Sequence, residues 1–301
     1  EILDAIESDT AYDAKEKELL KVGVHVLPKF PKDTTDRNRT SPFAFTGNKF
    51  EFRMLGSSAS ISDVNVVLNT AVAESLRQYA DILESAADFE TTLHDLIRDT
   101  IAKHKHIIFN GNGYDTGWLE EAKKRGLLNL KSTPDCVPYL IAKKNVSLFT
   151  SHKIYSEAEL HARYEIMLEN YCKVLRIEAL TMLDMVSTDI LPAVSDYTAT
   201  LMKTGAEKRS LLGESYGGYE MKTASRLAEL TDAASMDASK LDEALLQAGE
   251  EADAELAAKF YQAVVFKDMT ELRLTVDEME TLTSRACWPY PSYGELMFSV
   301  R

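Results

Sequence analysis

The feature that most constrains the fold of this chain is a long series of apolar residues at helical spacing. Between residues 64 and 83 the apolar side chains recur at intervals of three and four, and the same spacing returns from residue 160 onward. Stripes of this kind form the buried faces of amphipathic helices. We therefore predict roughly 200 residues of long antiparallel helices, with a break near Phe89.

Local signals predict where several of these helices begin and end. Ser156 and Glu159 have the S-x-x-E spacing of a capping box ahead of an apolar stripe, and Pro192 should kink or end that helix. A short helix at 117–125 should stop at Gly126. Further helices are expected at 216–233, 238–264 and 269–285, separated by the segments SMD and FKD. The aromatic tail WPYPSYGELMF is expected to pack as an extended segment.

A short β-containing part precedes the helices. Residues 1–21 are predicted to form a surface helix, and VGVHVL (residues 22–27) a short strand. The segment KFEFRM (residues 49–54) alternates apolar and charged residues, which is typical of a strand with one apolar and one charged face. The expected fold class is α+β, mostly α, with a few strands followed by a long-helix bundle.

Composition excludes several classes of protein. The 301 residues contain 34 Lys and Arg against 48 Asp and Glu, a net charge of −14 that argues against a nucleic-acid partner. No run of about 18 apolar residues occurs, so no membrane association is expected. The three cysteines (Cys136, Cys172 and Cys287) form no CxxC pair, which suits a reducing, cytoplasmic location. The chain begins at Glu1, without Met, and we expect it to be a piece of a longer protein.

The charged face of the 49–54 strand is the first candidate site. Lys49, Glu51 and Arg53 alternate along it, and a loop carrying Arg37 and Arg39 precedes it. A carboxylate flanked by cations stays ionised and can bind a hard divalent cation, while guanidinium groups match phosphate oxygens in bidentate fashion. The combination suits phosphoryl transfer. The alternative is an exposed ladder of opposite charges without a catalytic role.

Two further patterns favour structural interpretations. The glycines in Asn110–Gly113 imitate a dinucleotide-binding loop, but the next glycine is misplaced and no second βαβ unit follows, so a turn is the better reading. His104 and His106 lie two residues apart with no third metal ligand near in sequence. We interpret them as part of a basic helix C-terminus.

Three segments of the chain are similar to a known family. DRNRTSPFAFTGNKFEFRMLGSSAS (residues 36–60), HIIFNGNGY (106–114) and WPYPSYGELMF (288–298) resemble the C-terminal portion of glutamine synthetases of the long bacterial type III class. The resemblance implies that residues 1–106 are the C-terminal part of the catalytic domain and that 107–301 form a class-specific helical domain. It also implies ATP-dependent ligation of ammonia to glutamate through γ-glutamyl phosphate, the step of glutamine biosynthesis in nitrogen metabolism.

The resemblance assigns roles to five residues. Arg39, in the loop Asn-Arg-Thr, would contact substrate and phosphate, with Arg37 beside it. Glu51 would be a ligand of one of two divalent metals, Mg²⁺ or Mn²⁺, and Arg53 would bind phosphate or glutamate. Lys49 falls where the family often has a basic residue near the nucleotide phosphates. One departure is that residues 41–45 lack the further Arg of other classes.

The resemblance also has consequences for the chain on its own. The family's paired-carboxylate strand, its glycine–histidine segment and its N-terminal β-grasp domain have no counterpart here, so the isolated chain should be inactive and should not bind ATP or metal. The intact protein is expected to be a cytoplasmic dodecamer of two rings. The alternative function is a non-catalytic helical module for interaction or assembly.

Overall fold

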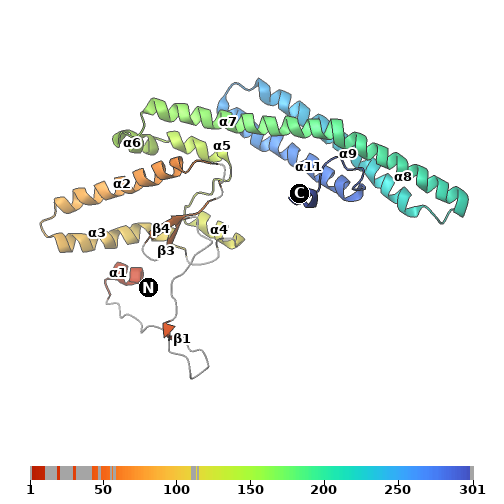
Figure 1. The fold of residues 1–301 in the computed structure, drawn as a ribbon. Helices are drawn as coiled ribbons and strands as arrows, with labels where there is room; N and C mark the ends of the chain where they lie inside the picture. The colour runs from red at the N-terminus through yellow and green to blue at the C-terminus, as the bar shows by residue number, and fades with distance from the viewer. Residues whose placement is uncertain are drawn as a thin grey trace. The chain divides into compact units, whose positions relative to one another are not determined.

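The computed structural model describes residues 2–10, 19–20, 30–31, 43–46, 49–54, 56, 59–109, 113 and 115–298. Helices dominate this part of the chain, and its strands are short (Figure 1). The chain divides into two compact units. The first consists of Glu1–Asn129 and Ser147–Ile154, and the second of Leu130–Val146 and Tyr155–Arg301. The boundary predicted at residue 106 separates a part of the catalytic domain from a helical domain. The two compact units do not test that assignment, so it stays a prediction.

The first unit combines two small sheets with helices. Its elements are α1 (Ile2–Ser8), β1 (Leu19–Leu20), β2 (Phe30–Pro31), β3 (Phe43–Thr46), β4 (Lys49–Phe52), α2 (Ser62–Glu84), α3 (Phe89–His104), the 3₁₀ turn η1 (Lys105–Ile107) and α4 (Thr116–Lys124). The strands β1 and β2 pair antiparallel, as do β3 and β4. α6 (Lys143–Ser151) contributes its C-terminal half to this unit.

The predicted helix over residues 1–21 is wrong in length. α1 ends at Ser8, and Asp9 follows with φ = 50°, a left-handed conformation that cannot continue a right-handed helix. Residues 19–20 belong to β1 instead, because they pair with β2. The strand predicted at residues 22–27 lies outside the described residues.

The predicted break near Phe89 is confirmed. α2 ends at Glu84, and α3 starts after Asp88, whose carboxylate accepts hydrogen bonds from the hydroxyl of Thr91 (2.6 Å) and from its backbone N–H (3.4 Å). This is an N-cap, which satisfies a backbone donor left free at the start of the helix. The predicted stop at Gly126 is also confirmed, since α4 ends at Lys124 and Gly126 has φ = 75°.

The second unit is a bundle of long helices. Its elements are α5 (Thr133–Cys136), η2 (Val137–Ile141), α7 (Glu157–Asp184), η3 (Met185–Ile190), α8 (Leu191–Leu212), α9 (Gly218–Glu250), α10 (Ala254–Phe260), η4 (Tyr261–Val265), α11 (Phe266–Leu282) and α12 (Tyr293–Met297). Figure 1 shows α7 continuing into α8, with α9 and α11 packed along them. The core between these helices includes Leu227, Leu241, Leu272 and Met279, all fully buried. The prediction of a mostly α protein with a long-helix bundle is confirmed.

The capping box ahead of α7 is present, and the helix does not end at Pro192. Ser156 Oγ accepts from the Glu159 backbone N–H (3.2 Å), and the Ser156 N–H donates to Glu159 Oε2 (2.7 Å). The chain stays helical through Pro192, the second residue of α8, and the π-helical turn η3 ends at Ile190, two residues before it. A π turn changes the hydrogen-bond register, which accommodates a residue that has no N–H to donate.

Three boundaries in the second half differ from prediction. The SMD segment does not interrupt α9, which is continuous over 33 residues, because Ser235, Met236 and Asp237 are all tolerated in a helix. The FKD segment likewise lies within α11. The actual break is at residues 251–253, where Asp253 caps α10.

The C-terminal tail is also more structured than expected. Ser292 and Glu295 form a second capping box, which starts α12 in a segment predicted to be extended. None of the helices in the described ranges combines the length and the apolar character needed to cross a bilayer.

Candidate functional site

The β3–β4 hairpin carries the candidate site. Its register places Phe43 opposite Phe52, Ala44 opposite Glu51, and Thr46 opposite Lys49. The rings of Phe43 and Phe50 stack with their centroids 4.9 Å apart and their planes 8° apart. Since successive residues of a strand point to opposite faces, this arrangement separates the phenylalanines from the charged residues. The alternation predicted for KFEFRM is therefore confirmed, with the strand itself ending at Phe52.

The three charged residues meet on the other face of β4. Arg53 Nε donates to Glu51 Oε2 at 3.0 Å, its Nη2 also contacts that oxygen, and Lys49 Nζ lies 3.3 Å from Glu51 Oε1. We call these residues the Lys49–Glu51–Arg53 cluster. The Glu51 side chain is the least exposed of the three, at 30%. One carboxylate is thus held between two cations, which leaves the cluster with a net positive charge.

Taken alone, the cluster is better suited to bind an anion than to bind a metal ion. A guanidinium group offers paired N–H donors that match a phosphate or carboxylate. A divalent cation such as Mg²⁺ needs about six oxygen ligands, and Glu51 is a single carboxylate. Among the described residues no group of three or more His, Cys, Asp or Glu side chains could hold a metal ion. The described part of the chain therefore does not complete a metal site.

The remaining candidate residues either lie outside the described part of the chain or belong to the end of α3 and the turn that follows it. Arg37 and Arg39 lie outside the described residues, as do residues 110–112 of the glycine-rich segment. His104 ends α3 and its ring lies 6.5 Å from that of His106. The His106 ring contacts the carbonyl of Lys103 at 3.2 Å, as expected for basic residues at a helix C-terminus.

The apolar side chains of the β3–β4 hairpin and of α2 are more exposed than the sequence pattern predicted. Phe50 is 61% exposed on the hairpin, and Leu76 is 61% exposed on α2. Val67, Val72 and Ile82 on α2 are exposed as well. The helical spacing predicted a buried face, and only Thr70 of α2 is buried. Periodicity identifies which residues share a face, but it does not say whether the same chain covers that face.

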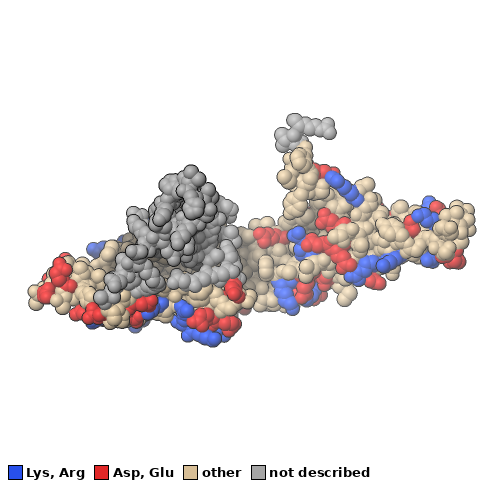
Figure 2. Space-filling view, turned by 90° about the horizontal axis from the view of Figure 1, so that it is seen from below, with Lys and Arg blue, Asp and Glu red and all other residues tan. Residues whose placement is uncertain are grey.

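The charged side chains of the described helices are otherwise mixed by sign. Figure 2 shows Lys and Arg interspersed with Asp and Glu along the face that it draws. Many of them pair locally, as Arg77 does with Glu74 (2.8 Å) and Asp81 (2.7 Å). The hydrogen bonds from Arg77, Gln78 and His152 hold the pKa of the Glu74 carboxyl well below its usual value.

Comparison with known proteins identifies the family. Residues 92–209 match the family described as "Glutamine synthetase C-terminal domain". The chain is 38% identical to the "Glutamine synthetase" of Butyrivibrio fibrisolvens, in an alignment covering 100% of this chain and 43% of the relative. It is 36% identical to the "Type-3 glutamine synthetase" of Dictyostelium discoideum (99% and 41%). It is 30% identical to the "Glutamine synthetase" of Bacteroides fragilis (95% and 40%).

The matches define both the family and the part of it that the chain represents. The chain spans about two fifths of the length of these relatives. It belongs to the glutamine synthetase family and corresponds to a C-terminal portion of its members. The resemblance found in the sequence is confirmed.

Proposed function

We propose that the chain is the C-terminal portion of an enzyme that ligates ammonia to glutamate with ATP, through γ-glutamyl phosphate. Its relatives are glutamine synthetases by name, which supports a ligase. The observation that carries the proposal is the Lys49–Glu51–Arg53 cluster, because it presents cations and a carboxylate on one strand face. The short strands β3 and β4 would then belong to the catalytic domain.

In this proposal the cations act on the phosphate. Negative charge spreads over the oxygens of a phosphoryl group during transfer, and guanidinium groups stabilise that charge. Arg53 and Arg39 would take this role at the reacting group, with Lys49 and Arg37 contacting phosphate or substrate. Glu51 would supply one carboxylate ligand to Mg²⁺ or Mn²⁺, and the remaining ligands would come from outside the described residues.

We further propose that the chain alone is inactive and that the complete protein is a cytoplasmic dodecamer of two rings. The exposed apolar residues of the hairpin and α2, among them Phe50 and Leu76, support contacts with protein that this chain does not contain. Large exposed apolar surfaces typically mark interfaces. Detection of γ-glutamyl transfer by the isolated chain would contradict the first part of this proposal.

The test compares the protein encoded by the complete reading frame with two variants, Glu51→Gln and Arg53→Gln. We expect glutamine formation to fall about 100-fold or more in each, because a positioned electrostatic group contributes about that factor. Asp95→Asn and Arg98→Gln are matched controls, since Arg98 and Asp95 form a comparable surface pair at 3.1 Å. The controls should keep full activity, and all four variants should keep the parent's thermal unfolding transition.

The same experiment decides between a ligase and the alternative, a helical interaction module. Full activity in both cluster variants would reject the assignment of the cluster. A complete protein that makes no glutamine in the presence of ATP, ammonia, glutamate and Mg²⁺ or Mn²⁺ would reject the ligase and favour the module.

A further inference from the structure

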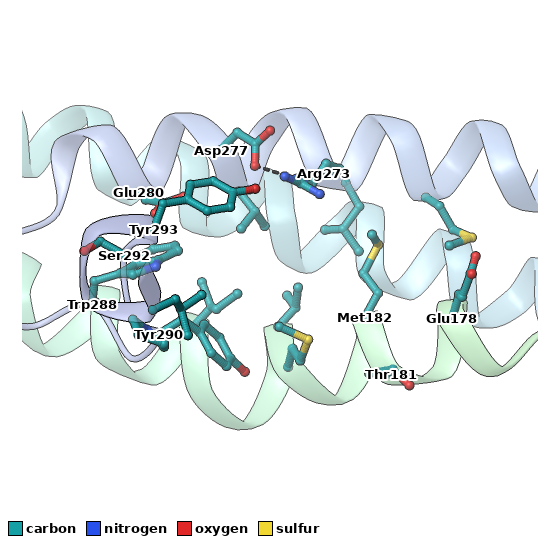
Figure 3. A pocket seen from close by; sticks show the side chains of 18 of the residues that line it. Glu178, Thr181, Met182, Arg273, Asp277, Glu280, Trp288, Tyr290, Ser292 and Tyr293 are labelled. Atoms are coloured by element: carbon teal, nitrogen blue, oxygen red, sulfur yellow. Dashed lines mark hydrogen bonds and ion pairs between the residues drawn. The ribbon is translucent and has the colours of Figure 1, made fainter. Parts of the chain in front are cut away.

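The second unit contains a groove that the proposed ligase function does not use. It lies between α7 with its π turn η3 on one side, α11 on the other, and the C-terminal segment 288–296 (Figure 3). Its volume is about 670 Å³. This size falls within the range of pockets that bind small molecules.

The walls of the groove are apolar and adaptable. Val186 and Leu272 line it and are buried, and the methionines that line it are Met182, Met185 and Met269. Methionine side chains are flexible and make favourable contacts with aromatic rings. Trp288, Tyr290 and Tyr293 gather at one end of the groove, as Figure 3 shows. Such a lining accepts an apolar or aromatic body.

The groove is held in shape by a π turn. Met185, Val186 and Ile190 belong to both η3 and the groove wall. π turns are rare interruptions of α-helices and occur frequently at functional sites. The phenol of Tyr290 donates a hydrogen bond to Asp189 of η3 at 2.7 Å, which fixes the C-terminal segment against this turn. The groove is therefore bounded by contacts within the chain itself.

Most polar groups of the lining already have partners. Arg273 pairs with Asp277 at 2.6 Å, and this contact, the dashed line in Figure 3, holds the pKa of the guanidinium above its usual value. The Thr181 hydroxyl donates to a backbone carbonyl, and Ser292 is engaged in its capping box. Within the described part of the chain, Glu178 and Glu280 form neither a hydrogen bond nor an ion pair. The polar groups left for a ligand are thus the carboxylates of Glu178 and Glu280, together with the phenol of Tyr293, the indole N–H of Trp288 and the Nη groups of Arg273.

We propose that this groove binds a small organic cation with an aromatic or aliphatic body. The cationic group lies at the aromatic end, against Glu280 and the rings of Trp288 and Tyr293, where a carboxylate and aromatic faces both attract positive charge. The body lies along the methionines. Phosphates and carboxylic acids are disfavoured, because the lining has three carboxylates, those of Glu178, Asp277 and Glu280, against the one guanidinium of Arg273. This inference does not rest on the proposed ligase function.

The test uses three probes that share an indole ring and differ in charge. Tryptamine is a cation, tryptophol is neutral and indole-3-propionate is an anion. Binding to the 301-residue chain is measured by isothermal titration calorimetry. We expect tryptamine to bind at least tenfold more tightly than tryptophol, and indole-3-propionate to show no binding.

The variants locate the site. Glu280→Gln should weaken tryptamine binding about five- to tenfold, as loss of one charge-assisted contact does. Glu243→Gln removes the same charge from an exposed position on α9 and should leave binding unchanged, which separates a local contact from net charge. Tryptophol binding should be equal in both variants. The proposal is overturned if tryptamine does not bind, if the three probes bind equally, or if the two variants behave alike.

Discussion

Tyr290 and Asp189 are 101 residues apart in the sequence, and their side chains are joined by a 2.7 Å hydrogen bond. The bond connects the C-terminal segment to the π turn η3, so it closes one side of the groove in the second unit. A second phenol, Tyr164 of α7, donates to Glu255 of α10 at 2.6 Å. In both hydrogen bonds the tyrosine hydroxyl is the donor, so each bond exists only while the phenol keeps its proton.

Because of these two tyrosines, the stability of the second unit should fall at strongly alkaline pH. Burial, together with the neighbouring carboxylate, raises the pKa of Tyr290 and of Tyr164 to about 12. Because the folded pKa exceeds the unfolded value of about 10, their contribution is complete below pH ~10 and is lost as the pH rises towards ~12. Absorbance at 295 nm should show a group of phenols that titrate late, with Tyr164 and Tyr290 among them. Tyr290→Phe and Tyr164→Phe should each remove one of them, and an unchanged curve in either variant would contradict this assignment.

Gly217 is required where α8 turns into α9. Its φ is 76°, and a Cβ there would lie 2.6 Å from the carbonyl oxygen of Gly205. Gly217→Ala should lower the free energy of unfolding by about 3 kcal/mol, through left-handed strain and a backbone clash. Gly218→Ala is the control, because its Cβ would meet nothing within 4 Å among the described atoms and it starts the helix. Urea denaturation should show no loss in the control, and equal losses would mean that the close approach is not the cause.

Lys240 neutralises a carboxylate in the core of the bundle. Asp268 is 3% exposed and its Oδ1 lies 2.7 Å from Lys240 Nζ. Lys240→Met should therefore destabilise the protein by about 2 kcal/mol, because it leaves a buried charge without its partner. Lys267→Met removes an exposed pair with Glu271 at 3.5 Å and should change the unfolding free energy by less than about 0.5 kcal/mol. A small effect in both variants would show that Asp268 is neutral or hydrated in the folded state.

The capping box at Ser156 starts α7, which continues through η3 into α8. Its hydrogen bonds with Glu159 hold the pKa of that carboxyl below its usual value, so the stability that they give is lost as the pH falls. Ser156→Ala should cost about 1 kcal/mol, as the loss of an N-cap does. Ser239→Ala, in the middle of α9, should be neutral or slightly stabilising. Circular dichroism during urea unfolding at pH 7 would reveal the difference, and equal midpoints would contradict the role of the cap.

The features that sequence predicted correctly depend on residues close together in the chain. The capping box needs only Ser156 and Glu159, and the strand face of Glu51 needs only a period of two. The same kind of signal, Ser292 and Glu295, starts α12 in the C-terminal tail, although the prolines and aromatics there favour an extended segment. Such signals are readable because each hydrogen bond closes within one turn.

In the candidate site, too, the sequence predicts only what neighbouring residues of one strand determine. Alternation predicts that Lys49, Glu51 and Arg53 share a face, and the structure adds that both cations contact the carboxylate. Among the described residues no group of three His, Cys, Asp or Glu side chains forms around Glu51, so the pattern along β4 does not by itself make a metal site.

The sequence by itself therefore determined the helical character of the chain, several helix ends, the charged face of β4 and membership of the glutamine synthetase family. Only the tertiary structure decided that α9 runs unbroken, that a π turn precedes Pro192, and that the C-terminal tail lines a groove. The reason is physical. Helix propensity and capping act over four residues, whereas burial and the Tyr290–Asp189 contact depend on segments that meet only after the chain has folded.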